Sequence, residues 1–188
     1  MKAAFTFGRF NPPTIGHKKL LDFSYDYAKK YDADFFVYLS HKFSKKDPLR
    51  YKTKLYWMKK IFPQYKSNIM DSDSRTALDV LVELYETGYT SVCMVVGSDR
   101  QKDFEKLLNK YNGKASSHGY YDFERIIVTS AGERDPDSSG VEGMSASKMR
   151  QAVIDDNIIV FFSGIPDTLN DYEKSELFSD VGAGLGVL

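Results

Sequence analysis

The sequence predicts an α/β protein built on a doubly wound, Rossmann-like parallel sheet of about five strands, with helices on both faces. Two observations support this fold class. Strand-like and helix-like segments alternate along most of the chain, and residues 90–96 form a near-continuous apolar run. Such a run is typical of a parallel strand that helices cover on both sides. In folds of this class ligands bind at the carboxyl ends of the strands, so the segments that follow the strands are where a functional site is expected.

Hydrophobic periodicity gives the expected elements in order. Strands are expected at residues 2–7, 33–39, 66–71, 90–96 and 123–129, the third being the weakest. Helices are expected at residues 16–31, 51–62, 75–87, 101–111 and from about 144 to 156. Ser74 is a candidate cap for the third of these helices, and Gly88 would end it.

The chain has 188 residues, which is enough for one α/β domain with a substantial core. We expect this domain to span residues 1–155 and to be followed by an acidic extension over 156–188. From residue 151 onward there are seven acidic residues against one lysine, and the last nine residues are rich in glycine. We therefore expect that end to be frayed.

Composition favours a small-molecule partner over a nucleic acid or a membrane. The 26 basic and 26 acidic residues cancel, whereas a dedicated nucleic-acid binder is normally basic. No segment reaches the roughly 18 apolar residues of a membrane span, and the N-terminus lacks the apolar region of a secretory signal, so we expect a soluble cytoplasmic protein. The single Cys93 is expected in the core. His41 and His118 have no metal-ligand spacing, so no protein-bound metal is expected.

The segment after the first strand has the character of a phosphate-binding loop. It consists of Gly8-Arg9-Phe10-Asn11-Pro12-Pro13-Thr14-Ile15-Gly16-His17. A helix that starts near His17 leaves backbone N–H groups without intrahelical partners and attracts anions, so the imidazole would face a bound phosphate. The spacing excludes a Walker A loop, because seven residues separate the two glycines and no Gly-Lys-Ser/Thr follows. The run Gly182-x-Gly184-x-Gly186 imitates a dinucleotide fingerprint, but no strand precedes it, and we expect no ligand there.

A second candidate phosphate site is the start of the helix near residue 145. Met144-Ser145-Ala146-Ser147-Lys148-Met149-Arg150 offers two hydroxyl groups, exposed N–H groups and two cations in one helical turn. A cationic first turn is unfavourable beside the positive end of the helix dipole, which favours a bound anion there. The alternative is an ordinary serine-capped helix.

Two further segments are less specific. Gly97-Ser98-Asp99 follows the most apolar strand and could equally be a plain turn. Between Lys42 and Lys60 the chain has eight basic residues against Asp47 alone, a pattern that usually forms a solvated face.

The opening loop resembles the nucleotidyltransferase superfamily of the cytidylyltransferase-like, HxGH type. In that superfamily a strand leads into Gly-x-Phe-x-Pro-x-(His/Thr)-x-Gly-His, and Gly8, Phe10, Pro12, Thr14 and Gly16-His17 fill every position. Thr14 is the variant of pantetheine-phosphate adenylyltransferases, while Gly8-Arg9-Phe10 resembles nicotinamide-mononucleotide adenylyltransferases. The family's second motif, Ile/Val-Ser-x-Thr-x-x-Arg, is similar to residues 144–150, with Met for Ile and Ser for Thr. The resemblance covers residues 2–155.

The resemblance implies transfer of a nucleotidyl group, with AMP from ATP favoured over CMP from CTP, to a phosphorylated small molecule with release of pyrophosphate. It places His17 and Thr14 at the α-phosphate and Arg150 at the β- and γ-phosphates. It assigns further nucleotide contacts to Gly8, Arg9, Phe10, Gly16, Gly97, Asp99, Ser145, Ser147 and Lys148. It assigns the acceptor's phosphate to Lys42 or Lys46, with Arg9 as a further candidate. Mg²⁺ would arrive with the nucleoside triphosphate, and a homo-oligomer is left open.

Two other readings remain open at this point. Residues 144–148 also resemble the Lys-Met-Ser-Lys-Ser loop of class I aminoacyl-tRNA synthetases, but the length and neutral charge argue against a tRNA-directed enzyme. The chain could instead be a non-catalytic nucleotide-binding or assembly protein that keeps the fold, for example in a phage particle. The acceptor itself cannot be deduced from the residues.

Overall fold

A computed structural model of the chain describes residues 1–132 and 144–188. These residues form two compact units, each assembled from separate segments of the chain. The sheet unit contains residues 1–8, 19–38 and the described part of 70–134. The helical unit contains residues 9–18, 39–69 and the described part of 135–188. Helix α1 (Ile15–Lys30) and strand β2 (Asp34–Leu39) contribute residues to both.

The sheet unit confirms the α/β class with a parallel sheet, although the sheet has four strands instead of about five. Besides β2 these are β1 (Lys2–Gly8), β3 (Ser91–Val96) and β4 (Arg125–Ser130). Their order is β2-β1-β3-β4, and β3 pairs in parallel with both β1 and β4. Because β1 and β3 are parallel neighbours, the loops after Gly8 and after Val96 start from the same edge of the sheet.

The expected third strand over residues 66–71 does not form. Pro63–Tyr65 is a short 3₁₀ helix, η1, and the chain then turns, with the Asn68 and Ile69 N–H groups both donating to the Tyr65 carbonyl. Only Ile69 and Met70 are apolar in this stretch, and the polar residues before them favour the turn. Met70 donates one backbone hydrogen bond to Val37 of β2, which is too little for a strand.

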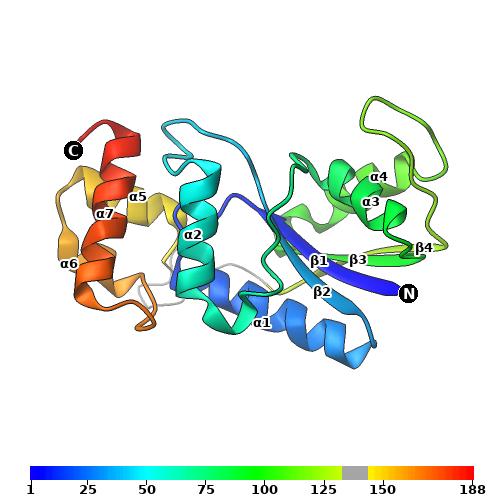
Figure 1. Ribbon diagram of the computed structural model, residues 1–188, viewed down its shortest axis with the longest axis horizontal. Coiled ribbons are helices and arrows are strands. Elements are labelled where there is room, and N and C mark those ends of the chain that lie inside the picture. Colours follow the sequence, from blue (N-terminus) through cyan, green and yellow to red (C-terminus); the bar gives the residue numbers. More distant parts are fainter. Residues whose placement is uncertain (133–143) are drawn as a thin grey trace. The chain divides into compact units, whose positions relative to one another are not determined.

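Helices cover both faces of the sheet (Figure 1). Helices α3 (Ala77–Glu86) and α4 (Gln101–Lys110) pack on one face, in a buried cluster that contains Phe5 of β1, Met94 of β3 and Leu81 of α3. The opposite face carries Cys93, which hydrogen-bonds Tyr27 of α1 and is buried as expected. Burial raises the pKa of the Cys93 thiol, so this cysteine is an inert part of the core.

Helix α3 begins at Ala77, two residues later than expected, and has a different N-cap. Its cap is Thr76, whose hydroxyl accepts from the Asp79 N–H while the Asp79 side chain accepts from the Thr76 N–H. The expected cap, Ser74, donates instead to the Glu83 carboxylate at 2.7 Å, beside the Tyr38 hydroxyl at 3.1 Å. A reciprocal capping box satisfies two backbone groups where a single serine would satisfy one, which explains the choice.

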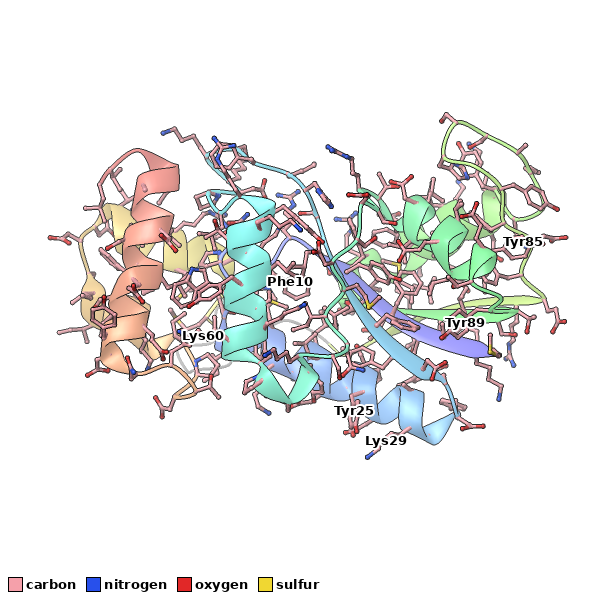
Figure 2. The ribbon with its side chains drawn as sticks, in the orientation of Figure 1. Phe10, Tyr25, Lys29, Lys60, Tyr85 and Tyr89 are labelled. Atoms are coloured by element: carbon pink, nitrogen blue, oxygen red, sulfur yellow. The ribbon has the colours of Figure 1, made fainter. Side chains whose placement is uncertain are left out.

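The helical unit contains α2 (Tyr51–Ile61), α5 (Ala146–Ile154), α6 (Ile158–Ser163) and α7 (Asp171–Leu185). Trp57 of α2 donates from Nε1 to Asp180 of α7 at 2.7 Å, and Lys60, labelled in Figure 2, lies 2.8 Å from Glu173. These contacts join α2 to α7 along their length. Among the described helices, none is both long and apolar enough to cross a lipid bilayer.

The expectation of a frayed C-terminal end is wrong. Helix α7 starts with a capping box between Asn170 and Glu173, and it buries Leu177, Val181 and Leu185, which recur every four residues on one face. Gly186 ends it in the left-handed conformation at φ 75°. The glycine-rich composition hid these two signals, because the apolar stripe continues through it.

Candidate functional site

The opening loop, residues 9–17, belongs to the helical unit and turns sharply at Phe10. Phe10 has φ 45°, which is unusual for a bulky residue, and its side chain is fully buried. Its ring packs edge-on against the His17 imidazole with 4.9 Å between centroids (Phe10 is labelled in Figure 2). The strained backbone thus places an aromatic wall beside the histidine, an arrangement found more often at functional sites than elsewhere.

The local hydrogen bonds define the tautomer of His17. The Thr14 backbone N–H donates to Nδ1 at 2.9 Å, and the Thr14 hydroxyl lies 3.2 Å from the same nitrogen. Because Nδ1 accepts, the neutral imidazole carries its proton on Nε2. His17 therefore carries its N–H donor on the side of the ring away from Thr14, and a donor is the polarity that a phosphate oxygen requires.

The start of helix α1 has fewer donors for an anion than the sequence suggested. The Ile15 N–H donates to the Gly164 carbonyl at 2.8 Å, and the His17 N–H donates to Thr14 at 3.0 Å. A Cβ at Gly164 would lie 2.2 Å from the Met149 sulfur, so glycine leaves room for the Met149 side chain beside this contact. Phosphate binding at this helix would rely on the His17 side chain more than on the helix terminus.

The second motif meets the opening loop through Arg150. Its Nη1 donates to the Asn11 carbonyl at 2.9 Å, and its Nη2 donates to the Ser147 hydroxyl at 3.1 Å. Ser145 caps α5, with its hydroxyl accepting from the Lys148 N–H at 3.2 Å. Burial lowers the pKa of the Arg150 guanidinium, and the Asp47 carboxylate opposes this shift. The serine-cap interpretation is therefore correct for Ser145, and the motif also supplies a fixed cation beside the opening loop.

Asn11, which sequence reasoning passed over, ties the opening loop to residues 40–49, the segment we call the basic loop. Its amide Nδ2 donates to the Leu49 carbonyl at 3.0 Å, and its Oδ1 accepts from the Leu49 N–H at 2.7 Å. Both residues are buried. The side chain thus pairs with the backbone of one residue of the basic loop as a neighbouring strand would, because an amide carries a donor and an acceptor side by side.

Sequence reasoning also missed two buried charged residues, Asp47 within the basic loop and Lys54 of α2, which contacts it at Ser40. Lys54 is fully buried and donates from Nζ to the Ser40 carbonyl at 2.6 Å. Burial lowers the pKa of Lys54 to about 8, with Asp47 raising it and Arg9 lowering it further. A signal existed for both residues: Lys54 shares a helical face with the buried Met58 and Ile61, and Asp47 is the only acid among eight bases.

Asp47 connects the charges of this region. Its Oδ1 has no hydrogen-bond partner. This oxygen lies 4.0 Å from Nε of Arg9, whose side chain is 58% exposed. Its Oδ2 accepts from the Ser44 hydroxyl at 3.1 Å. Its negative charge also raises the pKa of Lys54 and the pKa of Arg150, against the lowering effect of burial. Asp47 therefore balances three cations, and an anionic ligand would compete with it for Arg9.

The remaining predicted residues fall into two groups. Lys42, Lys46, Ser147 and Lys148 are exposed in the helical unit and open to solvent. Gly8, Gly97 and Asp99 belong to the sheet unit, where β1 ends at Gly8 and β3 leads through Gly97 into η2 (Ser98–Arg100). The arrangement brings together the phosphate-binding candidates of the opening loop and of α5.

Two features lie apart from this site or are missing from it. A groove of about 490 Å³ between α2 and α7 is lined by Tyr56, Trp57, Tyr172, Ser175, Glu176, Ser179 and Asp180, none of which we predicted as a site residue. Within the described ranges, no three His, Cys, Asp or Glu side chains gather as a metal site. The described residues thus offer no carboxylate cluster for a resident metal.

No family model and no curated protein matches this chain. The relation to nucleotidyltransferases therefore stays a prediction from the two motifs.

Proposed function

We propose that this protein is a nucleotidyltransferase that moves a nucleotidyl group, AMP from ATP in the version we favour, to a phosphorylated small-molecule acceptor. The observation that supports this best is the hydrogen bond from Arg150 to Asn11. It joins the two motifs, 139 residues apart in sequence, within one unit. This bond holds the guanidinium of the second motif beside the loop that carries His17.

In the proposed reaction, an oxygen of the acceptor's phosphate attacks the α-phosphorus in line. The bond from the α-phosphorus to the bridging oxygen breaks, and pyrophosphate leaves with that electron pair. No covalent enzyme intermediate forms, so the protein contributes positioning and charge stabilisation. We assign the Nε2 donor of His17 and the hydroxyl of Thr14 to the α-phosphate, where negative charge develops.

The cations divide between the leaving group and the acceptor. We assign Arg150, with Ser145, Ser147 and Lys148, to the β- and γ-phosphates, because an immobilised guanidinium loses little freedom on binding them. We assign Lys42 or Lys46, with Arg9, to the acceptor's phosphate. Mg²⁺ would arrive with the nucleoside triphosphate, bound to its phosphate oxygens, and would need few protein ligands.

The test is a pyrophosphate-release screen. Purified protein with Mg²⁺ is given ATP or CTP, each paired with nicotinamide mononucleotide, phosphopantetheine, flavin mononucleotide or a small alcohol phosphate. We expect release with one nucleotide and one acceptor class, and no release without the acceptor. Silence across the whole panel, together with calorimetric binding of ATP, would favour the non-catalytic nucleotide-binding protein.

A further inference from the structure

Gly184 near the end of α7 is in close contact with the basic loop. A Cβ built at Gly184 would lie 1.9 Å from the Pro48 carbonyl oxygen and 2.6 Å from its carbon. Both are backbone atoms, so no side-chain rotation could relieve the overlap. The helix and the basic loop can approach this closely only because residue 184 has no side chain.

A second contact from the same helix end holds the basic loop. The Lys45 ammonium donates to the Leu185 carbonyl, the last residue of α7. This is a favourable place for a cation, because the carbonyl groups of the final turn carry the negative end of the helix dipole. The basic loop is thus attached to α7 through Pro48 and Lys45, and to the opening loop through Leu49.

Hydrogen bonds close residues 44–47 of the basic loop into a turn. The Ser44 N–H donates to the Asp47 carbonyl at 3.0 Å, and the Asp47 N–H donates back to Ser44 at 2.9 Å. The Lys46 N–H also donates to the Ser44 hydroxyl at 3.2 Å. This closed turn carries Lys46 and Asp47, and it is followed directly by Pro48. A displacement of Pro48 would therefore be passed to Lys46 and Asp47.

From these contacts we infer that Gly184 is a positioning residue for the acceptor, acting through Pro48 to place Lys46 and Asp47. This inference rests on the proposed transfer reaction for its functional part. It gives the C-terminal glycine run, which matches no ligand motif, a role in the geometry of the site. Within this run the inference concerns Gly184, where an added Cβ would overlap the backbone of Pro48.

The test compares Gly184→Ala with a matched control, Gly182→Ala. Both substitutions add one methyl group to the same helix and raise its intrinsic helix propensity equally. At residue 182 the new Cβ would meet the side chain of the C-terminal Leu188, which is exposed and can turn away. At residue 184 the methyl group must push Pro48 by about 1 Å, a displacement that can cost up to about a hundredfold in an oriented reaction.

We expect Gly184→Ala to raise the KM of the acceptor by about tenfold or more while the KM of the nucleoside triphosphate stays unchanged. Gly182→Ala should resemble the wild type in both constants. Lys45→Met, a change at an exposed residue, removes the second contact and should shift the acceptor's KM in the same direction. Equal effects of the two glycine variants, or equal changes in both KM values, would overturn the inference.

Amide hydrogen exchange separates this inference from the proposed function. Without substrates, residues 45–49 should exchange faster in Gly184→Ala than in the wild type, and Gly182→Ala should leave them unchanged. If the wild type releases no pyrophosphate with any substrate pair, the proposed function fails and exchange alone decides the contact. Unchanged exchange at residues 45–49 would then show that Gly184 does not hold the basic loop.

Discussion

At the scale of single residues, the proposed chemistry depends on which nitrogen of His17 carries the proton. The Thr14 N–H occupies Nδ1, so the ring offers Nε2–H as a donor. A donor fixed in this way costs no reorganisation when negative charge develops on the α-phosphate oxygens, which is the condition for a large catalytic effect. Phe10 packs edge-on against the same ring, with 4.9 Å between the ring centroids.

The corresponding prediction uses His17→Asn. Asparagine can still accept the Thr14 N–H through Oδ1, but it cannot reach the position of Nε2. We expect turnover to fall by about 10²–10³, the usual cost of one preorganised transition-state donor. Initial rates of pyrophosphate release measure this, with His118→Ala in the sheet unit as the control. Because the His17 ring is largely buried, His17→Ala should also destabilise the fold, which makes it the less informative variant.

The buried amine of Lys54 predicts a pH dependence of stability. Its pKa is about 8 in the folded protein and 10.5 in the unfolded chain. Between these values the unfolded chain binds more protons, so the contribution of Lys54 to the free energy of unfolding rises with pH, by at most about 3 kcal/mol. Below pH 8 the amine is charged in both states and the full burial penalty applies.

Lys54→Met isolates this contribution from that of other titrating groups. Urea unfolding of the wild type and of the variant at pH 7.5 and pH 10 gives their stability difference at each pH. We expect the wild type to gain stability relative to Lys54→Met as the pH rises. A difference that is the same at both pH values would mean that folding does not lower the pKa of Lys54.

Single residues were predictable where they belong to a motif and unpredictable where only packing defines them. Thr14, His17 and Arg150 come from spacing in the sequence, and the structure shows Arg150 bonded to the loop that carries Thr14 and His17. Asn11 occupies a position that the motif leaves free, and its partner Leu49 is 38 residues away. No local pattern reveals such a long-range backbone contact.

At the scale of elements, the attachment of the opening loop to the basic loop is the feature most open to a stability test. Asn11→Ala leaves the buried N–H and carbonyl of Leu49 without partners. Since an unsatisfied buried group costs about 1–3 kcal/mol, we expect a loss of about 3 kcal/mol in the free energy of unfolding. Asn109→Ala is the control, because the Asn109 amide donates to Glu105 on an exposed surface of α4.

Urea denaturation of both variants measures the effect, with the slope of the transition as a check that the cooperativity of unfolding is kept. If Asn11→Ala unfolds at the same urea concentration as Asn109→Ala, water must replace the amide, and the contact between Asn11 and Leu49 does not contribute to the free energy of unfolding.

The elements themselves were predicted best where they are long and periodic. The expected strands at 2–7, 33–39 and 90–96 agree with β1, β2 and β3 to within two residues. The expected strand at 66–71 failed, because its two apolar residues are too few to outweigh a polar turn. Helices α6 and α7 were not separated from the acidic extension, since net charge and glycine content obscured a capping box and an apolar stripe.

At the scale of the whole molecule, the chain passes between its two units several times. The opening loop and the basic loop each leave the sheet unit at the end of a strand and belong to the helical unit. This division could not be predicted from the sequence, because it depends on which segments pack together and not on any change in composition. The predicted phosphate-binding residues at 9–17 and 145–150 fall within one unit. The proposal therefore predicts that one bound triphosphate protects both segments.

The test of this expectation is the pattern of protection that a triphosphate should produce. A ligand that binds only the folded protein stabilises it by about 2.7 kcal/mol at a hundred times its Kd. We expect ATP with Mg²⁺ to slow amide exchange at residues 9–18 and 145–150. Exchange in α3, which contains none of the predicted site residues, should stay unchanged and serves as the internal control.

The same measurement examines the other assignments separately. Slower exchange at residues 97–99 would support the assignment of Gly97 and Asp99 to the nucleotide, and slower exchange at 42–49 only after adding the acceptor would support the role of Lys42 or Lys46. Protection confined to the groove residues of α2 and α7 would place the ligand away from both motifs. In that case His17 and Arg150 would have structural roles, and the resemblance in the motifs would not extend to function.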